Sequence, residues 1–256
     1  MRVWKRRSNV STRRWAASSA TRNARAEWIA LACLHGGVFT RAQWTGFLEC
    51  HHEKVGRAVR KLVAQGVAIE EKPPGIRGIG RICRIHGRGI YKALGLGDHR
   101  RRRITSPEVM MRRLLGLDYA LEHPRLPWLP TEADRVAAFE ALGIERGLLP
   151  QRVYRGALGG LRRFFPLGLP IGLDTERAVF VYAEPGYETA TAIRSWGAKH
   201  GDLWKGLWDL GVNGTRQDME FGPAGGGSNL VGVLMCWAVP EVCKRQRGSM
   251  HILALR

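Results

Sequence analysis

Apolar residues in the first part of the chain recur at helical spacing in three successive segments, residues 26–35, 40–48 and 52–65. Glycines follow the first and the third segment, as is common at the carboxyl ends of helices. Thr40 precedes the second segment and Gln43 stands three residues after it, which is the pattern of a helix capping box. The pattern therefore predicts three short amphipathic helices in succession.

The period of the pattern changes after the third helix. Residues 67–72 and 81–86 have the composition of two short strands, and the segment between them is rich in glycine and proline. A short helix over residues 87–94 follows. Three helices followed by a β-hairpin are the order of a winged helix-turn-helix, so we expect a DNA-binding domain of this kind over residues 24–97.

The second half of the chain mixes helix and strand patterns. Its helices are predicted over residues 131–142 and 188–210, its buried strands over 167–173, 178–183 and 230–238, and a glycine-rich loop over 211–228. Thr131 and Asp134 have the spacing that caps the first of these helices. The mixture predicts an α/β domain over residues 123–256 and places the whole chain in the mixed α/β class.

A basic hinge and a helix separate the two predicted domains, over residues 98–122. The hinge contains four consecutive arginines, for which contact with phosphate and ordinary solvation are both open. The helix, over residues 108–121, is heavily apolar. Two roles are open for this helix. It could pack between two domains or two subunits, or it could belong to the core of the second domain.

The net charge of the chain indicates an anionic partner. The 256 residues contain 41 Lys and Arg against 22 Asp and Glu, which gives a net charge of +19. A polyanion relieves such self-repulsion, and nucleic acid releases its condensed counterions when it is bound. A GC-rich genome also favours arginine, so the charge supports DNA binding only together with the predicted layout. Residues 1–23 hold seven cations and no acid, which predicts a basic arm.

The predicted recognition helix and hairpin supply the candidate contacts. In a winged helix-turn-helix, side chains near the start of the recognition helix reach base edges, while the hairpin lies on the backbone. Arg57 has the fork geometry to pair with a guanine, and lysines suit phosphates. We predict DNA contacts from the following residues: Arg41, His51, His52, Lys54, Arg57, Arg60, Lys61, Lys72, Arg77, Arg81, Arg100, Arg101, Arg102 and Arg103.

Candidate zinc and nucleophile motifs are weak. Cys83 and His86 resemble half a zinc site that residues 50–52 could complete, but alternation along a strand would turn the pair to opposite faces. The chain has no nucleophile elbow and no phosphate-binding P-loop. We therefore expect no metal and no cofactor.

Two acids could form a nuclease centre. Asp174 and Glu184 each end a predicted strand, and metal-dependent cleavage needs carboxylates that converge at a sheet end. The lysine that usually accompanies such a pair is missing after Glu184. We therefore expect no enzymatic activity, with a metal-dependent nuclease as an alternative.

Membrane and export signals are absent from the pattern. The longest apolar runs are too short to cross a bilayer, and the charged start of the chain is not followed by an apolar stretch. Five scattered cysteines suit reduced thiols. These features predict a cytoplasmic protein associated with the nucleoid or a plasmid.

Four segments carry a family resemblance: WLPTEADRVAAF (128–139), LPQRVYR (149–155), RFFPLGLPI (163–171) and VFVYAEPGYET (179–189). With the predicted winged unit before them, they resemble the replication-relaxation-like proteins of conjugative plasmids and integrative elements. The resemblance implies a degenerate restriction-endonuclease-like second domain with Glu184 as the strand-end acid. Pro185 departs from the family pattern where an aspartate-containing turn is expected, which argues against catalysis.

The sequence thus predicts a homodimeric, sequence-specific protein that binds double-stranded DNA. Its role would be transcription regulation, or replication and maintenance of a mobile genetic element. The second domain would serve as a scaffold or as a surface for a protein partner. Besides the nuclease, a second alternative is that the chain is a non-catalytic interaction subunit of a larger nucleoprotein complex.

Overall fold

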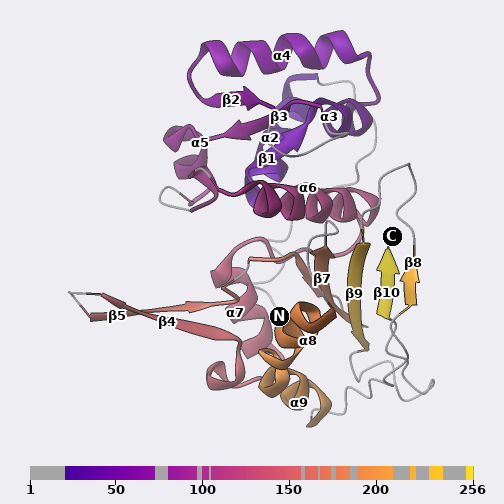
Figure 1. Cartoon of the computed structure of the whole chain (residues 1–256). Helices are drawn as coiled ribbons and strands as arrows, with labels where there is room; N and C mark the ends of the chain where they lie inside the picture. Colours follow the sequence, from indigo (N-terminus) through magenta and orange to yellow (C-terminus); the bar gives the residue numbers. More distant parts are fainter. Residues whose placement is uncertain are drawn as a thin grey trace. The chain divides into compact units, whose positions relative to one another are not determined.

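The computed structural model describes residues 21–72, 80–96, 100–103, 105–156, 159–166, 168–173, 177–184, 190–209, 220–222, 231–238 and 252–255. It is a mixed structure of helices and sheets, in agreement with the predicted class (Figure 1). The chain divides into two compact units, with the boundary between Pro124 and Arg125. Each unit has a hydrophobic core of its own. Of the basic arm predicted over residues 1–23, residues 1–20 lie outside the described residues, and residues 21–23 belong to the first helix.

The first unit contains helices around a small sheet. Its elements are α2 (Thr21–His35), β1 (Val38–Thr40), α3 (Arg41–Leu48), α4 (His52–Ala64), β2 (Ala68–Glu71), β3 (Ile82–Ile85), α5 (Arg88–Ala93), the 3-10 turn η2 (Arg100–Arg102) and α6 (Pro107–Glu122). The three strands are antiparallel in the order β1-β3-β2, with Val38 opposite Arg84 and Ala68 opposite Ile85. The three predicted helices and both predicted hairpin strands are therefore confirmed.

Local chemistry explains where these elements begin and end. The predicted capping box forms, since the Thr40 hydroxyl accepts from the Gln43 amide and the Gln43 side chain accepts from the Thr40 amide. Gly37 follows α2 with a φ of 76°, and a Cβ there would lie 2.5 Å from the Tyr91 hydroxyl. Only glycine fits a left-handed position this close to another side chain, which fixes the end of α2.

Aromatic side chains form the centre of the first core. Trp28 stacks on Trp44 with ring centroids 6.0 Å apart, and Phe39 meets both rings edge-on. Val55 and Val59 of α4 are fully buried in the same cluster. The core therefore fixes α4 through one of its faces and leaves the opposite face uncovered by this cluster.

Helix α6 is part of the first unit, so the alternative that it is a core helix of the second domain is wrong. Its Leu117 is fully buried in the core with Trp28 and Phe39. The Gln43 side chain donates to the Leu114 carbonyl and to the Asp118 carboxylate, at 3.0 and 2.8 Å. The apolar pattern of α6 thus reflects packing against β1 and α2.

The second unit is built on a mainly antiparallel sheet. Its elements are α7 (Glu132–Ala141), the 3-10 turn η3 (Arg146–Leu148), β4 (Gln151–Gly156), β5 (Gly159–Phe164), β6 (Ile171–Leu173), β7 (Arg177–Glu184), α8 (Ala190–Ala198), α9 (Gly201–Asp209), β8 (Glu220–Gly222), β9 (Val231–Ala238) and β10 (Ile252–Leu255). The sheet has the order β6-β7-β9-β10-β8, in which only the β10–β8 pair is parallel. Strands β4 and β5 form a separate two-stranded ribbon.

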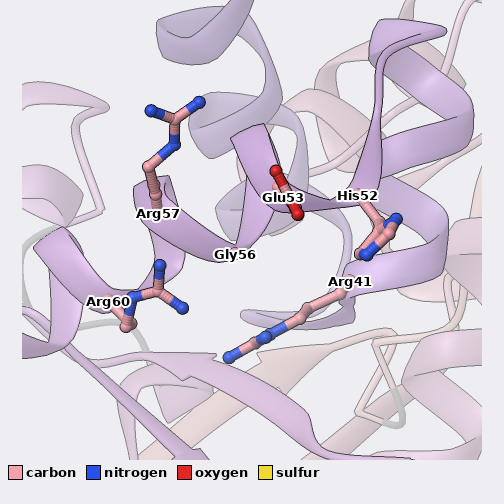
Figure 2. Close-up of a pocket in the computed structure, with 6 residues that line it drawn as sticks. All are labelled: Arg41, His52, Glu53, Gly56, Arg57 and Arg60. Atoms are coloured by element: carbon pink, nitrogen blue, oxygen red, sulfur yellow. The ribbon is translucent and has the colours of Figure 1, made fainter.

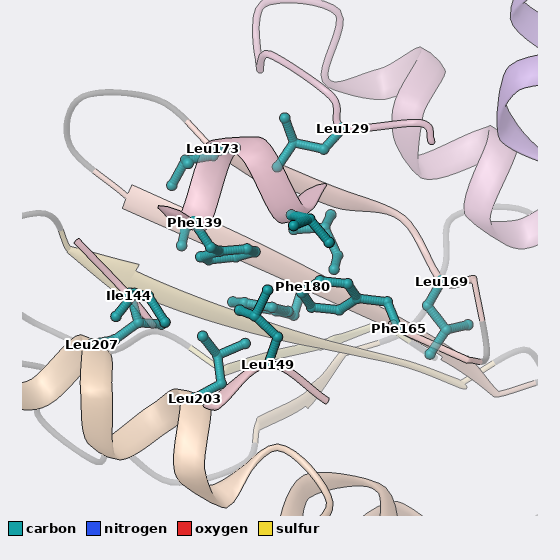
Figure 3. Packing of buried hydrophobic residues seen from close by; sticks show 14 of the residues in the cluster. Leu129, Phe139, Ile144, Leu149, Phe165, Leu169, Leu173, Phe180, Leu203 and Leu207 are labelled. Carbon is teal, nitrogen blue, oxygen red and sulfur yellow. The ribbon is translucent and has the colours of Figure 1, made fainter. Parts of the chain in front are cut away.

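The second core lies between this sheet and its helices. Figure 3 shows Phe139 of α7, Phe180 of β7 and Leu203 of α9 in one cluster. The Phe139 ring stacks on Phe165 and on Phe180, with centroids 5.6 and 5.8 Å apart. The capping box predicted for α7 forms between Thr131 and Asp134.

Three details of the second unit differ from the sequence prediction. The helix predicted over residues 188–210 is broken by a turn between α8 and α9. The glycine-rich segment 211–228 contains the short strand β8. The β4–β5 ribbon was not predicted, and it extends away from the rest of the second unit (Figure 1).

Candidate nucleic-acid interface

Helix α4 has one buried and one basic face. Val55 and Val59 are buried on the first face, with Leu62 partly buried beside them. One helical turn advances 3.6 residues, so positions 54, 57 and 61 fall on the opposite face. The cations Lys54, Arg57, Arg60 and Lys61 are all exposed. The amphipathic pattern of residues 52–65 therefore predicted the exposed cations and most of the core face, but Val63, expected in the apolar stripe, is exposed.

A shallow pocket of about 480 Å³ lies beside this face. It is lined by Arg41, His52, Glu53, Gly56, Arg57 and Arg60 (Figure 2). The Nη1 atoms of Arg41 and Arg60 would lie 3.4 and 3.8 Å from a Cβ at Gly56. The missing side chain at Gly56 thus leaves room where two guanidinium groups converge.

Arg41 is held in place by an ion pair. Its Nε and Nη2 donate to the two carboxylate oxygens of Glu70, both at 2.6 Å, and this hydrogen bonding raises the pKa of Arg41. The Glu70 side chain is 9% exposed and the Arg41 side chain 40%. A bidentate pair fixes the orientation of a guanidinium, so Arg41 adds a positioned donor but little net charge. This pairing was not predicted.

His51 and His52, which were predicted as DNA contacts, lie at the amino end of α4. Both are exposed, and their ring centroids are 4.3 Å apart. With Glu53 they form a group whose ligand atoms lie within 4.8 Å of one another, the single such group in the part of the chain that the structure describes. These three residues are consecutive and open to solvent, and Cys50 beside them is half-buried.

The hairpin residues Lys72 and Arg81 are exposed just beyond the ends of β2 and β3. Arg77, predicted at the tip between them, lies outside the described residues. The first unit therefore places two of the three hairpin cations on its surface, one after β2 and one before β3.

The arginine run over residues 100–103 requires a correction. Arg101 is only 6% exposed and donates to the Leu34 carbonyl at the end of α2. Arg102 is half-buried, and its Nε donates to the His86 carbonyl at 3.1 Å. Both side chains donate to backbone carbonyls, and Arg101 has almost no surface left for contact with phosphate. Arg103 is exposed, and the side chain of Arg100 lies outside the described residues.

Cys83 is a core residue. Its side chain packs with Phe39 and Val55, and burial raises the pKa of its thiol to about 12. Metal binding requires the thiolate, which such an environment disfavours. Cys83 thus has a packing role in place of the zinc ligand weighed from its spacing to His86.

Of the two candidate nuclease acids, the structure describes Glu184 at the end of β7. Asp174 lies outside the described residues, but Leu173 before it pairs with Ala178 on the antiparallel strand β7. Glu184 ends that strand six residues further on, so it lies roughly 20 Å from this pair. Because β6 and β7 are antiparallel, their carboxyl ends lie at opposite ends of the paired strands. The prediction for Asp174 thus lies outside the described residues, and what the structure shows is that Glu184 is far from the end of β6 at Leu173.

Four arginines outside the predicted set are exposed on the β4–β5 ribbon: Arg152, Arg155, Arg162 and Arg163. None of them was predicted to contact DNA, although Arg152, Arg155 and Arg163 lie in segments that carry the family resemblance. The available signal was a pair of short segments, 151–155 and 161–165, with β-prone residues such as Val153 and Tyr154 on either side of the glycine-containing stretch 156–160, which is typical of a hairpin.

Comparison of the chain with protein-family models, with curated proteins and with solved structures finds no match. The family resemblance therefore stays a prediction. Among the described residues, no helix is both long and apolar enough to cross a bilayer.

Proposed function

We propose that the chain is a sequence-specific protein that binds double-stranded DNA, with the first unit acting as a winged helix-turn-helix. The order α3, short turn, α4 supports this proposal, because α4 follows α3 where a recognition helix follows the first helix of the motif. The antiparallel β2–β3 hairpin follows α4 in the position of a wing. Figure 1 shows α4 along the outer edge of the first unit.

The exposed cations of α4 are the observation that carries the proposal. Lys54, Arg57 and Lys61 lie opposite the face that Val55 and Val59 bury. The major groove admits an α-helix, so this face can approach base edges while the core stays intact. Arg57 can pair with the O6 and N7 atoms of a guanine, and the two lysines can contact phosphates on either side.

The pocket beside Gly56 suits a phosphate. Arg60 and the Glu70-bound Arg41 both direct a guanidinium nitrogen toward it. Charged donors in fixed positions bind phosphate more strongly than mobile ones, because less conformational entropy is lost. A phosphate here would fix the register of α4 along the groove.

The biological role that we propose is transcription regulation, or replication and maintenance of a mobile genetic element, without turnover. The resemblance to replication-relaxation-like proteins supports this role and a restriction-endonuclease-like ancestry for the second unit. A homodimer would hold two half-sites together and raise specificity. The second unit would then be a scaffold or a partner surface of a cytoplasmic, nucleoid- or plasmid-associated protein.

Selection of bound sequences from random duplexes tests the proposal. The full chain at 0.1 M salt should enrich one motif, and Arg57→Ala should relax the preference at a single base position. Arg25→Ala is the matched control, because Arg25 is an exposed arginine on α2 of the same unit. Absence of an enriched motif would contradict sequence-specific binding and favour the role of an interaction subunit.

A further inference from the structure

We infer that the β4–β5 ribbon of the second unit is a second DNA-binding element, which lies in a groove of the duplex. The inference rests on the proposed function, since it assumes that the partner is double-stranded DNA. It concerns Gln151–Gly156 and Gly159–Phe164, which pair antiparallel from Gln151 opposite Phe164 to Gly156 opposite Gly159.

The ribbon is anchored only at its base among the contacts of the described residues. The Phe164 amide donates to the Glu132 carboxylate of α7 at 3.0 Å, and the Phe165 amide donates to the Pro150 carbonyl at 2.7 Å. Arg146 lies over the Phe164 ring, 5.3 Å from its centroid. Beyond this base the two strands extend away from the other elements of the second unit (Figure 1).

Both faces of the ribbon are exposed. Val153 is 55% and Leu161 53% exposed, and Tyr154 is exposed beside Leu161 on the neighbouring strand. An isolated two-stranded ribbon is only marginally stable in water, and exposed apolar side chains do not stabilise it. These features are typical of a surface that is completed by a partner.

The charges of the ribbon select an anionic partner. Arg152 stands directly opposite Arg163, which destabilises a free ribbon because like charges face each other. Arg155 and Arg162 lie on the other face, and residues 151–164 contain no acid. Glu132 lies 3.6 Å from Arg163 and offsets part of this repulsion, since the Arg152–Arg163 pair is next to the base of the ribbon. Binding of phosphates on both sides would remove this repulsion.

Duplex DNA fits this surface better than an acidic protein does. The major groove is about 12 Å wide and admits a two-stranded ribbon, with phosphates along both walls. Cations on both faces of the ribbon can therefore contact both walls at once. Each of the four cations is an arginine, whose planar fork matches phosphate oxygens in pairs.

A charge-matched pair of variants tests the inference with the full chain and its selected duplex. Arg155→Gln with Arg162→Gln should weaken binding about tenfold at 0.1 M salt and reduce the salt slope by about two. The control, Arg194→Gln with Lys205→Gln, removes the same charge from exposed positions on α8 and α9. It should bind as the wild type does, and equal binding by both double variants would overturn the inference.

Two further readouts separate this inference from the proposed function. The ribbon variant should keep the selected motif, because α4 reads it, whereas Arg57→Ala should change the motif. If Arg57→Ala has no effect but the ribbon variant still weakens binding, the α4 proposal fails and the ribbon inference stands. A photocrosslinking residue in place of Val153 should join the DNA, and one in place of the exposed Ala198 should not. Crosslinking of position 153 to protein alone, or to nothing, overturns the inference.

Discussion

Single residues of the first unit show how its core and its surface are coupled. Asp118 on α6 accepts a hydrogen bond from Gln43, whose backbone belongs to the capping box of α3. Burial raises the pKa of Asp118 to about 6, with Glu122 adding to the rise and the Gln43 hydrogen bond opposing it. The first unit therefore contains a carboxylate that titrates near physiological pH.

Asp118→Asn should stabilise the protein at neutral pH. The folded state holds the pKa of Asp118 above its unfolded value of about 4, so protonation favours folding. The contribution of Asp118 to the free energy of unfolding is greatest below about pH 4, where the carboxyl is protonated in both states. It is lost as the pH rises through 6. Asparagine keeps the acceptor for Gln43 without the charge. We expect a gain of about 1–2 kcal/mol at pH 7.5 and almost none at pH 4.

Urea unfolding of both proteins at the two pH values measures this difference. Asp202→Asn is the control, because Asp202 is exposed on α9. An equal gain for Asp118→Asn at both pH values would contradict the raised pKa.

Gly56→Ala should separate stability from DNA binding. Alanine suits a helix interior better than glycine by about 1 kcal/mol. A Cβ at this position meets the Arg41 and Arg60 guanidinium groups at ordinary contact distances, so the methyl fits. It also occupies the space proposed for a phosphate. We expect a higher melting temperature together with weaker binding in fluorescence anisotropy.

A combined rise in stability and affinity for Gly56→Ala would show that the pocket takes no phosphate. Gly89→Ala provides a control, since Gly89 lies in α5 with nothing near its Cβ position. That substitution should leave DNA affinity unchanged.

At the scale of elements, α3 depends on its cap. The Thr40 hydroxyl accepts from the Gln43 amide at 3.1 Å, and Trp44 on the next turn is buried in the core. Loss of such a cap costs about 1 kcal/mol. Thr40→Ala should lower the free energy of unfolding by this amount in urea titration, and Thr40→Ser should restore most of it. Equal stability of the two variants would contradict the role of the hydroxyl.

Elements determined by local sequence could be predicted, and those determined by distant pairing could not. The capping residues Thr40 and Thr131 and the amphipathic pattern of α4 act within a few residues, so they predicted the starts and faces of these helices. The sheet order and the separation of Glu184 from the β6 end depend on strands far apart in the chain. Spacing along the sequence does not encode those distances.

The candidate site was predicted in part for the same reason. The exposure of Lys54, Arg57 and Lys61 follows from their helical phase relative to buried valines. The burial of Arg101 and the pairing of Arg41 with Glu70 depend on which groups the fold brings near them. An arginine run shows its charge in the sequence, whereas its carbonyl partners become visible only in the fold.

At the scale of the whole molecule, exposed cations occur on both units. The cations of α4 lie on the first unit and those of the β4–β5 ribbon on the second, within a chain of net charge +19. Contacts of both units with one duplex would release many counterions. We expect the logarithm of the affinity to fall with the logarithm of salt at a slope of about −5 or steeper. A slope near −2 would show that only a few phosphates are bound.

Anisotropy titration of the selected duplex with the wild-type chain, Arg57→Ala/Arg60→Ala and Arg25→Ala tests DNA binding through α4 most directly. The α4 double variant should bind at least about tenfold more weakly than the wild type, since each contact with a base or phosphate is worth about 1 kcal/mol or more. Arg25→Ala should stay close to the wild type. Equal affinity of the α4 double variant and the wild type would contradict the proposed function.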